Sequence, residues 1–271
     1  MIDNTIIGAA FESDRQLRSM LIDTSDGTVQ PVDDLSLRLF KIRAAGNAGR
    51  LSSASILINR QYAWRGYQTK PLTPDQNLDR ITLVASDEDV TIGTMSISFD
   101  GADGLLVEEL FPDEVRGLRE AGHRVCEFTK LAMDSVLGSR RVLASLFHVA
   151  YIYAYRVKGF DCVLIEVNPR HVKYYEKILG FEVMGSVRMN TRVNAPAVLL
   201  CLKFAHTEQQ IGKFGGQPMM SVTERSLYPY SFSVAEEAGI VGRLKGSVRP
   251  AEPGTYQPRL DADQFARYRA R

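Results

Sequence analysis

The chain has 271 residues, of which 45% are hydrophobic and 24% are charged, as in a globular protein with one good core. Its 33 basic side chains are balanced by 32 acidic ones, so no global field recruits nucleic acid or an anionic membrane. The three cysteines lie far apart in apolar runs and indicate neither a disulfide framework nor a metal site. No signal peptide and no membrane-spanning run is visible, so we expect a cytoplasmic protein with no transmembrane segment.

The first third of the chain predicts an extension followed by the start of a sheet. Residues 1–36 are polar and rich in turn residues, which predicts an N-terminal extension outside the core. Alternation over residues 37–43 predicts the first strand, and apolar spacing over residues 47–67 predicts a helix. We interpret the basic, aromatic end of that helix as rings that pack on the sheet, in preference to side chains that contact the substrate. Residues 81–85 and 90–99 predict a hairpin.

The middle of the chain carries a carboxylate on an apolar strand. Residues 108–122 predict a surface excursion with a short helix, and residues 124–134 predict a strand. A period of two puts five of its side chains on one face: Val125, Glu127, Thr129, Leu131 and Met133. Ser139 then opens a predicted helix to about residue 158, whose buried stripe includes Leu146 and whose other side carries His148.

The next unit can be interpreted residue by residue. Residues 161–167 form a β-branched apolar run, which predicts a strand. Asn168 is a good helix N-cap, and Pro169 fits the first helical position. Gly180 stands where a left-handed residue would end the helix. Residues 182–188 and 197–204 predict two last strands, so the core closes near Phe204.

Glycine and proline interrupt residues 205–271, in which only residues 233–245 predict a helix, with Ser233 and Glu236 spaced as a capping box. This segment is too small for its own core and too apolar for a solvated tail. We therefore expect a C-terminal extension that packs on the core. A dimerisation arm is the alternative.

This order of elements, with Tyr175-Glu176-Lys177 before Gly180-Phe181, resembles the GNAT superfamily of N-acyltransferases over residues 37–204. The resemblance implies an α/β fold with a mixed central sheet flanked by helices. Acetyltransferases of that superfamily hold coenzyme A at a Gly-rich turn before the long helix. Here residues 134–141 contain one glycine, so that cradle is not encoded.

A closer resemblance is to long-chain N-acyl amino acid synthases, which are related in fold to autoinducer synthases. It rests on Glu127-Phe128-Thr129-Lys130, Leu146-Phe147-His148, Asn168-Pro169-Arg170-His171 and residues 194–200. It implies an enzyme that moves a fatty acyl group from an acyl thioester to the amine of an amino acid. Acyl carrier protein would be the partner and donor, with acyl-CoA as the other co-substrate and no tightly bound cofactor. Lys130 stands where those synthases have Arg, and a lysine cannot form the same bidentate fork.

Acyl transfer needs a base, donors for the oxyanion and an acid for the thiolate. Glu127 is the candidate base because an apolar strand face raises a carboxyl pKa, with a structural ion pair as the equal alternative. The resemblance places the oxyanion donors at the amides of Leu131, Ala132 and Met133, and the acid at Tyr175, whose ring can equally be core.

Several further side chains are candidates for acid–base catalysis, substrate binding or carrier-protein docking. His148 and His171 could act as bases or contact the substrate carboxylate, although a lone histidine is more often structural. Arg170, beside Asn168, is a plausible carboxylate anchor, with a solvated arginine as the alternative. Arg140 and Arg141, joined by Arg116, Arg119 and Arg124, could dock an acidic carrier protein.

Three other functions stay open at this point. Within enzymes they are an autoinducer-type acyl-homoserine-lactone synthase and an acetyl-CoA-dependent N-acetyltransferase. Outside enzymes, the alternative is a non-catalytic module that binds acyl chains or carrier protein.

Overall fold

The computed structural model describes residues 5–11, 38–46, 48–63, 72, 79–135 and 137–247. One mixed sheet forms its centre, with strands in the order β1-β2-β3-β4-β5-β6-β9-β7 and β8 paired to β9. The strands are β1 (Thr5–Phe11), β2 (Arg38–Ala44), β3 (Arg80–Asp87), β4 (Val90–Phe99), β5 (Val125–Met133), β6 (Cys162–Val167), β7 (Glu182–Val183), β8 (Arg188–Asn190) and β9 (Ala195–Lys203). Among the pairs described, only β5 with β6 is parallel.

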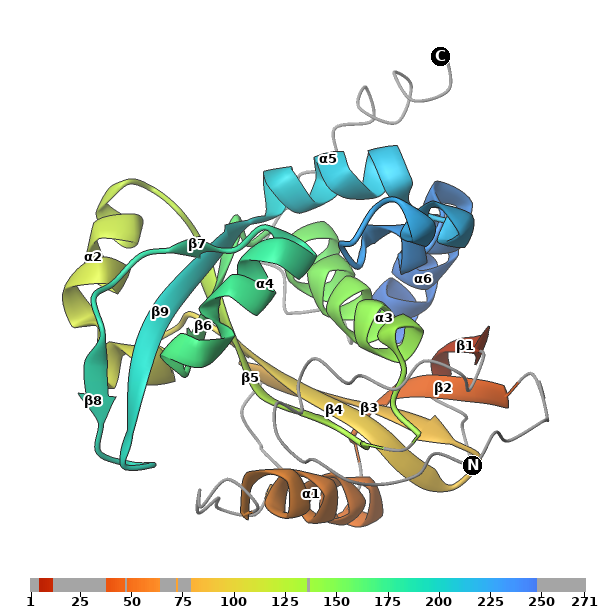
Figure 1. Ribbon diagram of the computed structural model, residues 1–271, viewed down its shortest axis with the longest axis horizontal. Helices are drawn as coiled ribbons and strands as arrows, with labels where there is room; N and C mark the ends of the chain where they lie inside the picture. The colour runs from red at the N-terminus through yellow and green to blue at the C-terminus, as the bar shows by residue number, and fades with distance from the viewer. Residues whose placement is uncertain are drawn as a thin grey trace.

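Helices cover both faces of this sheet (Figure 1). They are α1 (Ala48–Ala63), α2 (Pro112–Glu120), α3 (Arg140–Tyr151), α4 (Val172–Leu179), α5 (Phe204–Phe214) and α6 (Val234–Ser247). Buried side chains of α1 and α2 pack on one face of the sheet, and those of α3 to α6 pack on the other. Short 3-10 turns lie at Leu106–Glu109, Pro169–His171, Pro218–Val222 and Tyr228–Tyr230. The predicted mixed sheet flanked by helices is confirmed.

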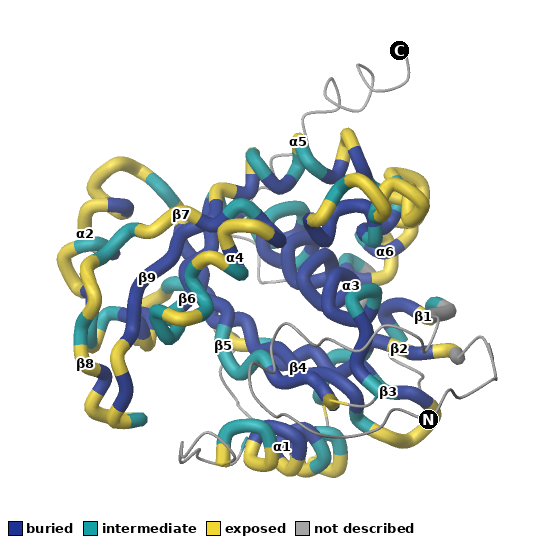
Figure 2. Tube along the Cα trace, in the orientation of Figure 1, coloured by how far each residue is buried: buried dark blue, intermediate teal, exposed yellow. Residues whose placement is uncertain are grey.

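The helix α3 is buried all round, as Figure 2 shows along its length. Ser139 caps its first turn by accepting a hydrogen bond from Val142 N–H at 3.2 Å. Every residue from Val142 to Tyr151 is buried, and the helix continues as a π-helical segment, Ile152–Val157. A helix buried on all sides needs cover beyond one sheet face. That cover comes from the C-terminal segment, so the side of α3 that the sequence placed opposite its buried stripe is also inside the protein.

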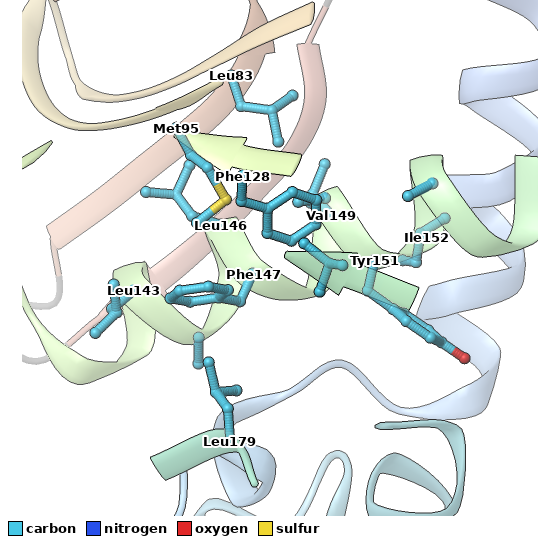
Figure 3. Packing of buried hydrophobic residues seen from close by; sticks show 14 of the residues in the cluster. Leu83, Met95, Phe128, Leu143, Leu146, Phe147, Val149, Tyr151, Ile152 and Leu179 are labelled. Carbon is cyan, nitrogen blue, oxygen red and sulfur yellow. The ribbon is translucent and has the colours of Figure 1, made fainter. Parts of the chain in front are cut away.

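The central packing joins this helix to the sheet. Phe128 of β5 lies against Phe147 with ring centroids 6.4 Å apart, and Met95 and Leu146 pack beside them (Figure 3). Burial of such side chains is worth about 1.5–3 kcal/mol each. The large apolar cluster on this face therefore holds β5 in place on one side.

The local prediction for α4 is confirmed. Asn168 Oδ1 accepts from Arg170 N–H at 3.2 Å, and Pro169 occupies the first helical position. The helix ends at Gly180, whose φ of 79° is left-handed. The predicted hairpin is also confirmed as β3 and β4, and the excursion after it contains α2.

Part of the N-terminal extension belongs to the sheet, which its polar composition did not predict. Residues 5–11 form β1, an edge strand antiparallel to β2. Ile6 and Ile7 are both buried in the main core. Five of the seven residues of β1 are apolar, and pairing with β2 satisfies the backbone of the strand.

The prediction of a single helix beyond Phe204 is wrong, because α5 also lies there. Its buried residues, Phe204, Thr207, Ile211 and Phe214, recur at helical spacing. Gly212 inside α5 costs only about 1 kcal/mol, which the burial of three apolar side chains outweighs. The capping box before α6 is confirmed, since Ser233 N–H donates to Glu236 Oε2 at 2.8 Å.

Residues 204–247 pack against the rest of the protein. Tyr228 donates its hydroxyl to the Leu179 carbonyl at 2.6 Å, and Arg243 donates to the Ile6 carbonyl at 2.7 Å. Leu227, Phe232 and Ile240 are buried in the same apolar cluster as α3. Within the described ranges, no helix combines the length and apolar character that crossing a bilayer requires.

Candidate active site at the opening between β5 and β6

The two parallel strands in the middle of the sheet separate halfway along. β5 pairs with β6 only at Val125, Cys126 and Glu127. β6 stays paired to β9 along its whole length, and β5 stays paired to β4. The rest of β5, from Phe128 onward, therefore has no pairing with β6. We call this unpaired stretch between β5 and β6 the opening. The first residues of both strands, before the opening, are buried.

A bulge redirects β5 inside that opening. Ser96 and Thr94 of β4 pair with Thr129 and Ala132, so two residues of β5 stand opposite Met95. Lys130 is one of them and has a φ of 53°, and its carbonyl accepts from the Thr94 hydroxyl at 2.9 Å. An extra residue reverses the alternation of every side chain after it.

The predicted face of β5 is therefore wrong after Thr129. Met133 joins the core on the α3 side, whereas Ala132 packs with Leu57 and Ile58 of α1. Leu131 is half-buried, and its carbonyl accepts from the Tyr62 hydroxyl at 3.5 Å. The remaining aromatic and basic residues of the predicted helix end, Trp64, Arg65 and Tyr67, lie outside the described residues.

Glu127 lies where β5 and β6 part, and its side chain is buried with 1% exposure. Its Oε2 accepts a hydrogen bond from Leu106 N–H at 2.8 Å, donated by the 3-10 turn that precedes α2. Burial raises the pKa of this carboxyl to about 7, against the opposing effect of the backbone amides of Leu106 and Val107. A carboxyl with this pKa exchanges a proton readily near neutral pH.

Other charged groups surround Glu127 on the same face. Glu166 of β6 raises its pKa and Arg192 lowers it. Glu166 accepts hydrogen bonds from Asn190 Nδ2 and from Arg192, the latter at 3.3 Å. Arg192 also contacts Glu109 at 3.2 Å. Glu166, Asn190 and Arg192 were not among the residues that the sequence indicated.

The sequence contains a partial signal for Glu166 and only a weak one for Asn190 and Arg192. Glu166 shares the period of two with Leu164, which pairs with Glu127, so strand pairing would have indicated it. Asn190 ends β8 and Arg192 lies in the turn after it, and the positions of both depend on contacts distant in sequence.

The residues around the start of α4 lie beyond the end of β6. His171 is half-buried and accepts from Arg170 Nε at 3.2 Å. The Arg170 side chain is otherwise exposed. Tyr175 is buried, with its ring edge-on to Phe181 at 5.9 Å and to Tyr174 at 5.4 Å. Asn168 is occupied by the helix cap described above.

His148 lies in the contact between α3 and the C-terminal segment. Its Nδ1 accepts from Phe232 N–H at 2.9 Å, and its Nε2 lies 3.1 Å from Glu237 Oε2. An Nδ1 that accepts is unprotonated, so the Nε2 proton faces Glu237. Both ring nitrogens are therefore engaged in holding the C-terminal segment, and neither faces the opening beside Glu127.

The arginines considered for docking are mostly engaged. Arg140 donates to the carbonyls of Arg225 and Ser226, at 2.6 and 3.1 Å. Arg119 is held by Asp100 and Glu108, and Arg124 donates to the carbonyls of Lys158 and Gly159. Arg116 pairs within α2. Only Arg141 of this set forms no hydrogen bond or ion pair with a described residue.

The turn before α3 is closed by its own groups. Asp134 accepts from Leu137 N–H at 2.9 Å and pairs with Arg60. A Cβ added at Gly138 would lie 2.4 Å from the Asp134 carbonyl oxygen, so the turn is tightly folded. The amides of Leu137 and Val142 thus already have acceptors inside the protein.

A small apolar cavity of about 20 Å³ lies where α3 meets the C-terminal segment. Phe128, Phe147, Leu179 and Leu227 contribute to its wall. Tyr151 also lines it, and its buried hydroxyl has no hydrogen-bond partner among the described residues. The described residues contain no group of three His, Cys, Asp or Glu side chains able to hold a metal.

Comparisons with known proteins bear on this geometry. The chain is similar in structure to FeeM, an N-acyl amino acid synthase from uncultured soil microbes, with 27% identity and a TM-score of 0.55. That match covers 61% of this chain and 90% of FeeM. The acyl-homoserine-lactone synthase LasI matches with 14% identity and a TM-score of 0.47, over 61% of this chain and 90% of LasI.

An N-acetyltransferase from Staphylococcus aureus Mu50 matches with 13% identity and a TM-score of 0.43, over 61% of this chain and 98% of that one. Comparison with curated proteins gives no match.

The family model described as N-acyl amino acid synthase FeeM matches residues 53–203, more than half of the chain. The matched region includes β5, β6 and the opening between them. The sheet has the GNAT-like architecture that the sequence predicted, and the protein is an N-acyltransferase. The chain belongs to the FeeM family of N-acyl amino acid synthases.

Proposed function

We propose that this protein transfers a fatty acyl group from acyl carrier protein to the amine of an amino acid. The observation that carries the proposal is Glu127, a buried carboxyl with a pKa of about 7 at the opening of the sheet. An amino acid presents an ammonium group at neutral pH, which must lose a proton before its nitrogen can attack. A carboxylate poised near pH 7 can take that proton, directly or through one water.

The bonds change as follows. The freed amine attacks the thioester carbonyl, a C–N bond forms, and the carbonyl oxygen becomes an oxyanion. The oxyanion then collapses, the C–S bond breaks, the nitrogen gives up a second proton, and the thiolate accepts one. The products are an N-acyl amino acid and the free thiol of the carrier, with one proton released from the original ammonium.

We assign the remaining roles to groups around the opening. The backbone amides of Leu131, Ala132 and Met133 are the proposed oxyanion donors, because this end of β5 lacks pairing with β6. Tyr175 is the proposed acid for the thiolate, with His171 as the other titratable group near the end of β6. His148 has no part in this proposal, since its ring nitrogens hold the C-terminal segment.

The choice of carrier protein as donor rests on the turn before α3. A coenzyme A pyrophosphate would need free backbone amides at a helix start. Here Asp134 and Ser139 already accept from the amides of Leu137 and Val142. Arg141 remains as the docking candidate, because Arg140 holds the C-terminal segment. A cytoplasmic location follows from this choice of donor.

The acyl chain needs a covered apolar site. We place the end of the chain in the cavity between α3 and the C-terminal segment, because Phe128 links that cavity to the opening. Its volume of about 20 Å³ suits one small terminal group. Residues 204–247 would then set how long a chain the enzyme accepts.

The first prediction concerns the base. Glu127→Gln should lower kcat by roughly a hundredfold to ten-thousandfold, because an amide keeps the size but cannot take a proton. In the unaltered enzyme, kcat/KM should rise with pH through about 7, since the carboxylate form is the active one. A circular dichroism spectrum controls for folding. Near-normal turnover by the folded variant would remove Glu127 from the mechanism.

The second prediction concerns the donor. At equal concentrations, dodecanoyl carrier protein should give a clearly higher kcat/KM than dodecanoyl-CoA. Arg141→Glu should slow only the carrier-protein reaction, and added salt should do the same, because the docking is electrostatic. The CoA reaction of each variant is its internal control. A preference for dodecanoyl-CoA would refute the assignment.

The third prediction concerns chain length. Leu227→Ala enlarges the cavity and should move the preferred acyl chain to a longer one. Leu244→Ala is the matched control, because Leu244 is equally buried in the C-terminal segment but does not line the cavity. Each variant should lose about 2–5 kcal/mol of stability. If both or neither change the chain-length preference, the cavity does not hold the chain.

A further inference from the structure

A cation stands over the same face of the sheet as Glu127. Arg192 follows β8, in the turn that leads into β9, and it is close enough to lower the pKa of Glu127. Its side chain is 34% exposed, so it is reachable from solvent. Glu127 is buried, and Glu166, which Arg192 contacts at 3.3 Å, also acts on the pKa of Glu127.

The contacts of Arg192 leave much of its guanidinium unused. Nε contacts Glu109 at 3.2 Å, and Nη2 contacts Glu166 at 3.3 Å. Both are longer than the 2.7–2.9 Å typical of charge-assisted hydrogen bonds. Arg192 offers one donor to each of these two carboxylates, whereas a guanidinium has five donors in a planar fork. Nη1 donates to no described residue, and Glu109 itself is 58% exposed.

Glu166 is fixed more firmly than Arg192. Asn190, which is buried with 4% exposure, donates to its Oε1. Its Oε2 faces Arg192, and its side chain is 15% exposed. A carboxylate held in this way, next to a second carboxylate with a raised pKa, offers a place for an ammonium group.

We propose that Arg192 binds the carboxylate of the acceptor amino acid while Glu166 and Glu127 receive its ammonium group. The inference rests on the proposed function and adds the residue that makes the enzyme require a carboxylate. The zwitterion of an amino acid matches the alternation of charge along this cluster, with its carboxylate displacing Glu109 from the exposed fork of Arg192. Simple amines lack that second anchor.

Arg170 is the alternative anchor for the carboxylate, because it lies just before α4 and just after β6, the strand that carries Glu166. Its Nε donates to His171, and no contact joins it to Glu127 or Glu166 among the described interactions. The purely structural alternative for Arg192 is that it ties the β8–β9 turn to the 3-10 turn through Glu109.

The test compares an amino acid with the amine that lacks its carboxylate. The unaltered enzyme is first screened with the common amino acids, and the best acceptor is paired with its amine, such as leucine with isopentylamine or phenylalanine with 2-phenylethylamine. Arg192→Gln should raise KM for the amino acid roughly tenfold to a hundredfold and leave KM for the amine almost unchanged. Arg192→Lys should fall between, because it keeps the charge without the fork.

Loss of Arg192 also alters the pKa of Glu127, but that effect acts on both acceptors alike. The ratio of the two KM changes therefore isolates the carboxylate contact. Equal changes for both acceptors in Arg192→Gln would overturn the inference, as would the selective loss appearing in Arg170→Gln instead. An unaltered enzyme with the same kcat/KM for the amine as for the amino acid would also overturn it. If the unaltered protein acylates neither, the proposed function itself fails.

Discussion

The pairing between β5 and β6 ends at Glu127, and the candidate site depends on that limit. Three paired residues on each strand bury the start of the opening under α2 and α3. Beyond them, β6 follows β9 and β5 follows β4, so neither strand has to give up its other partner. The sheet thereby places a carboxyl at the edge of its interior while each strand keeps one paired edge.

Burial of Glu127 makes its proton affinity sensitive to its surroundings. The Leu106 amide favours the charged form, and burial favours the neutral one more strongly. The balance of Glu166 against Arg192 then sets the final value. A structural ion pair, which was the alternative for Glu127, would give a lowered pKa and a direct basic partner. The hydrogen bond of Glu127 instead comes from a backbone amide, which fits a group that gains and loses a proton.

Local chemistry explains which parts the sequence could predict. Asn168, Pro169 and Gly180 determine the ends of α4 by their own geometry, and the strand before them follows from its β-branched residues. Glu127 stood out because a carboxylate is unusual in an apolar strand. The bulge at Lys130 could not be predicted, since it arises from the register between β4 and β5.

The burial of His148 and the cluster around Arg192 depend on segments far apart in the chain. The side of α3 that carries His148 has the polar residues typical of an exposed helix face, but in the folded protein the C-terminal segment covers it. Nothing in the sequence around Arg192 distinguishes it from the other arginines. Its position near Glu166 results from the pairing of β8 with β9 and of β9 with β6. Long-range contacts thus account for the residues that pattern and spacing missed.

The central claim is that Glu127 titrates near pH 7 inside the folded protein, and its carboxyl can be observed directly. Carbon-13 NMR of protein labelled at the glutamate side-chain carboxyl carbons would follow each glutamate with pH, and Glu127→Gln would identify the signal. The midpoint of that signal should lie near 7, well above the usual value for glutamate. A midpoint near the usual value of about 4.3 would contradict it.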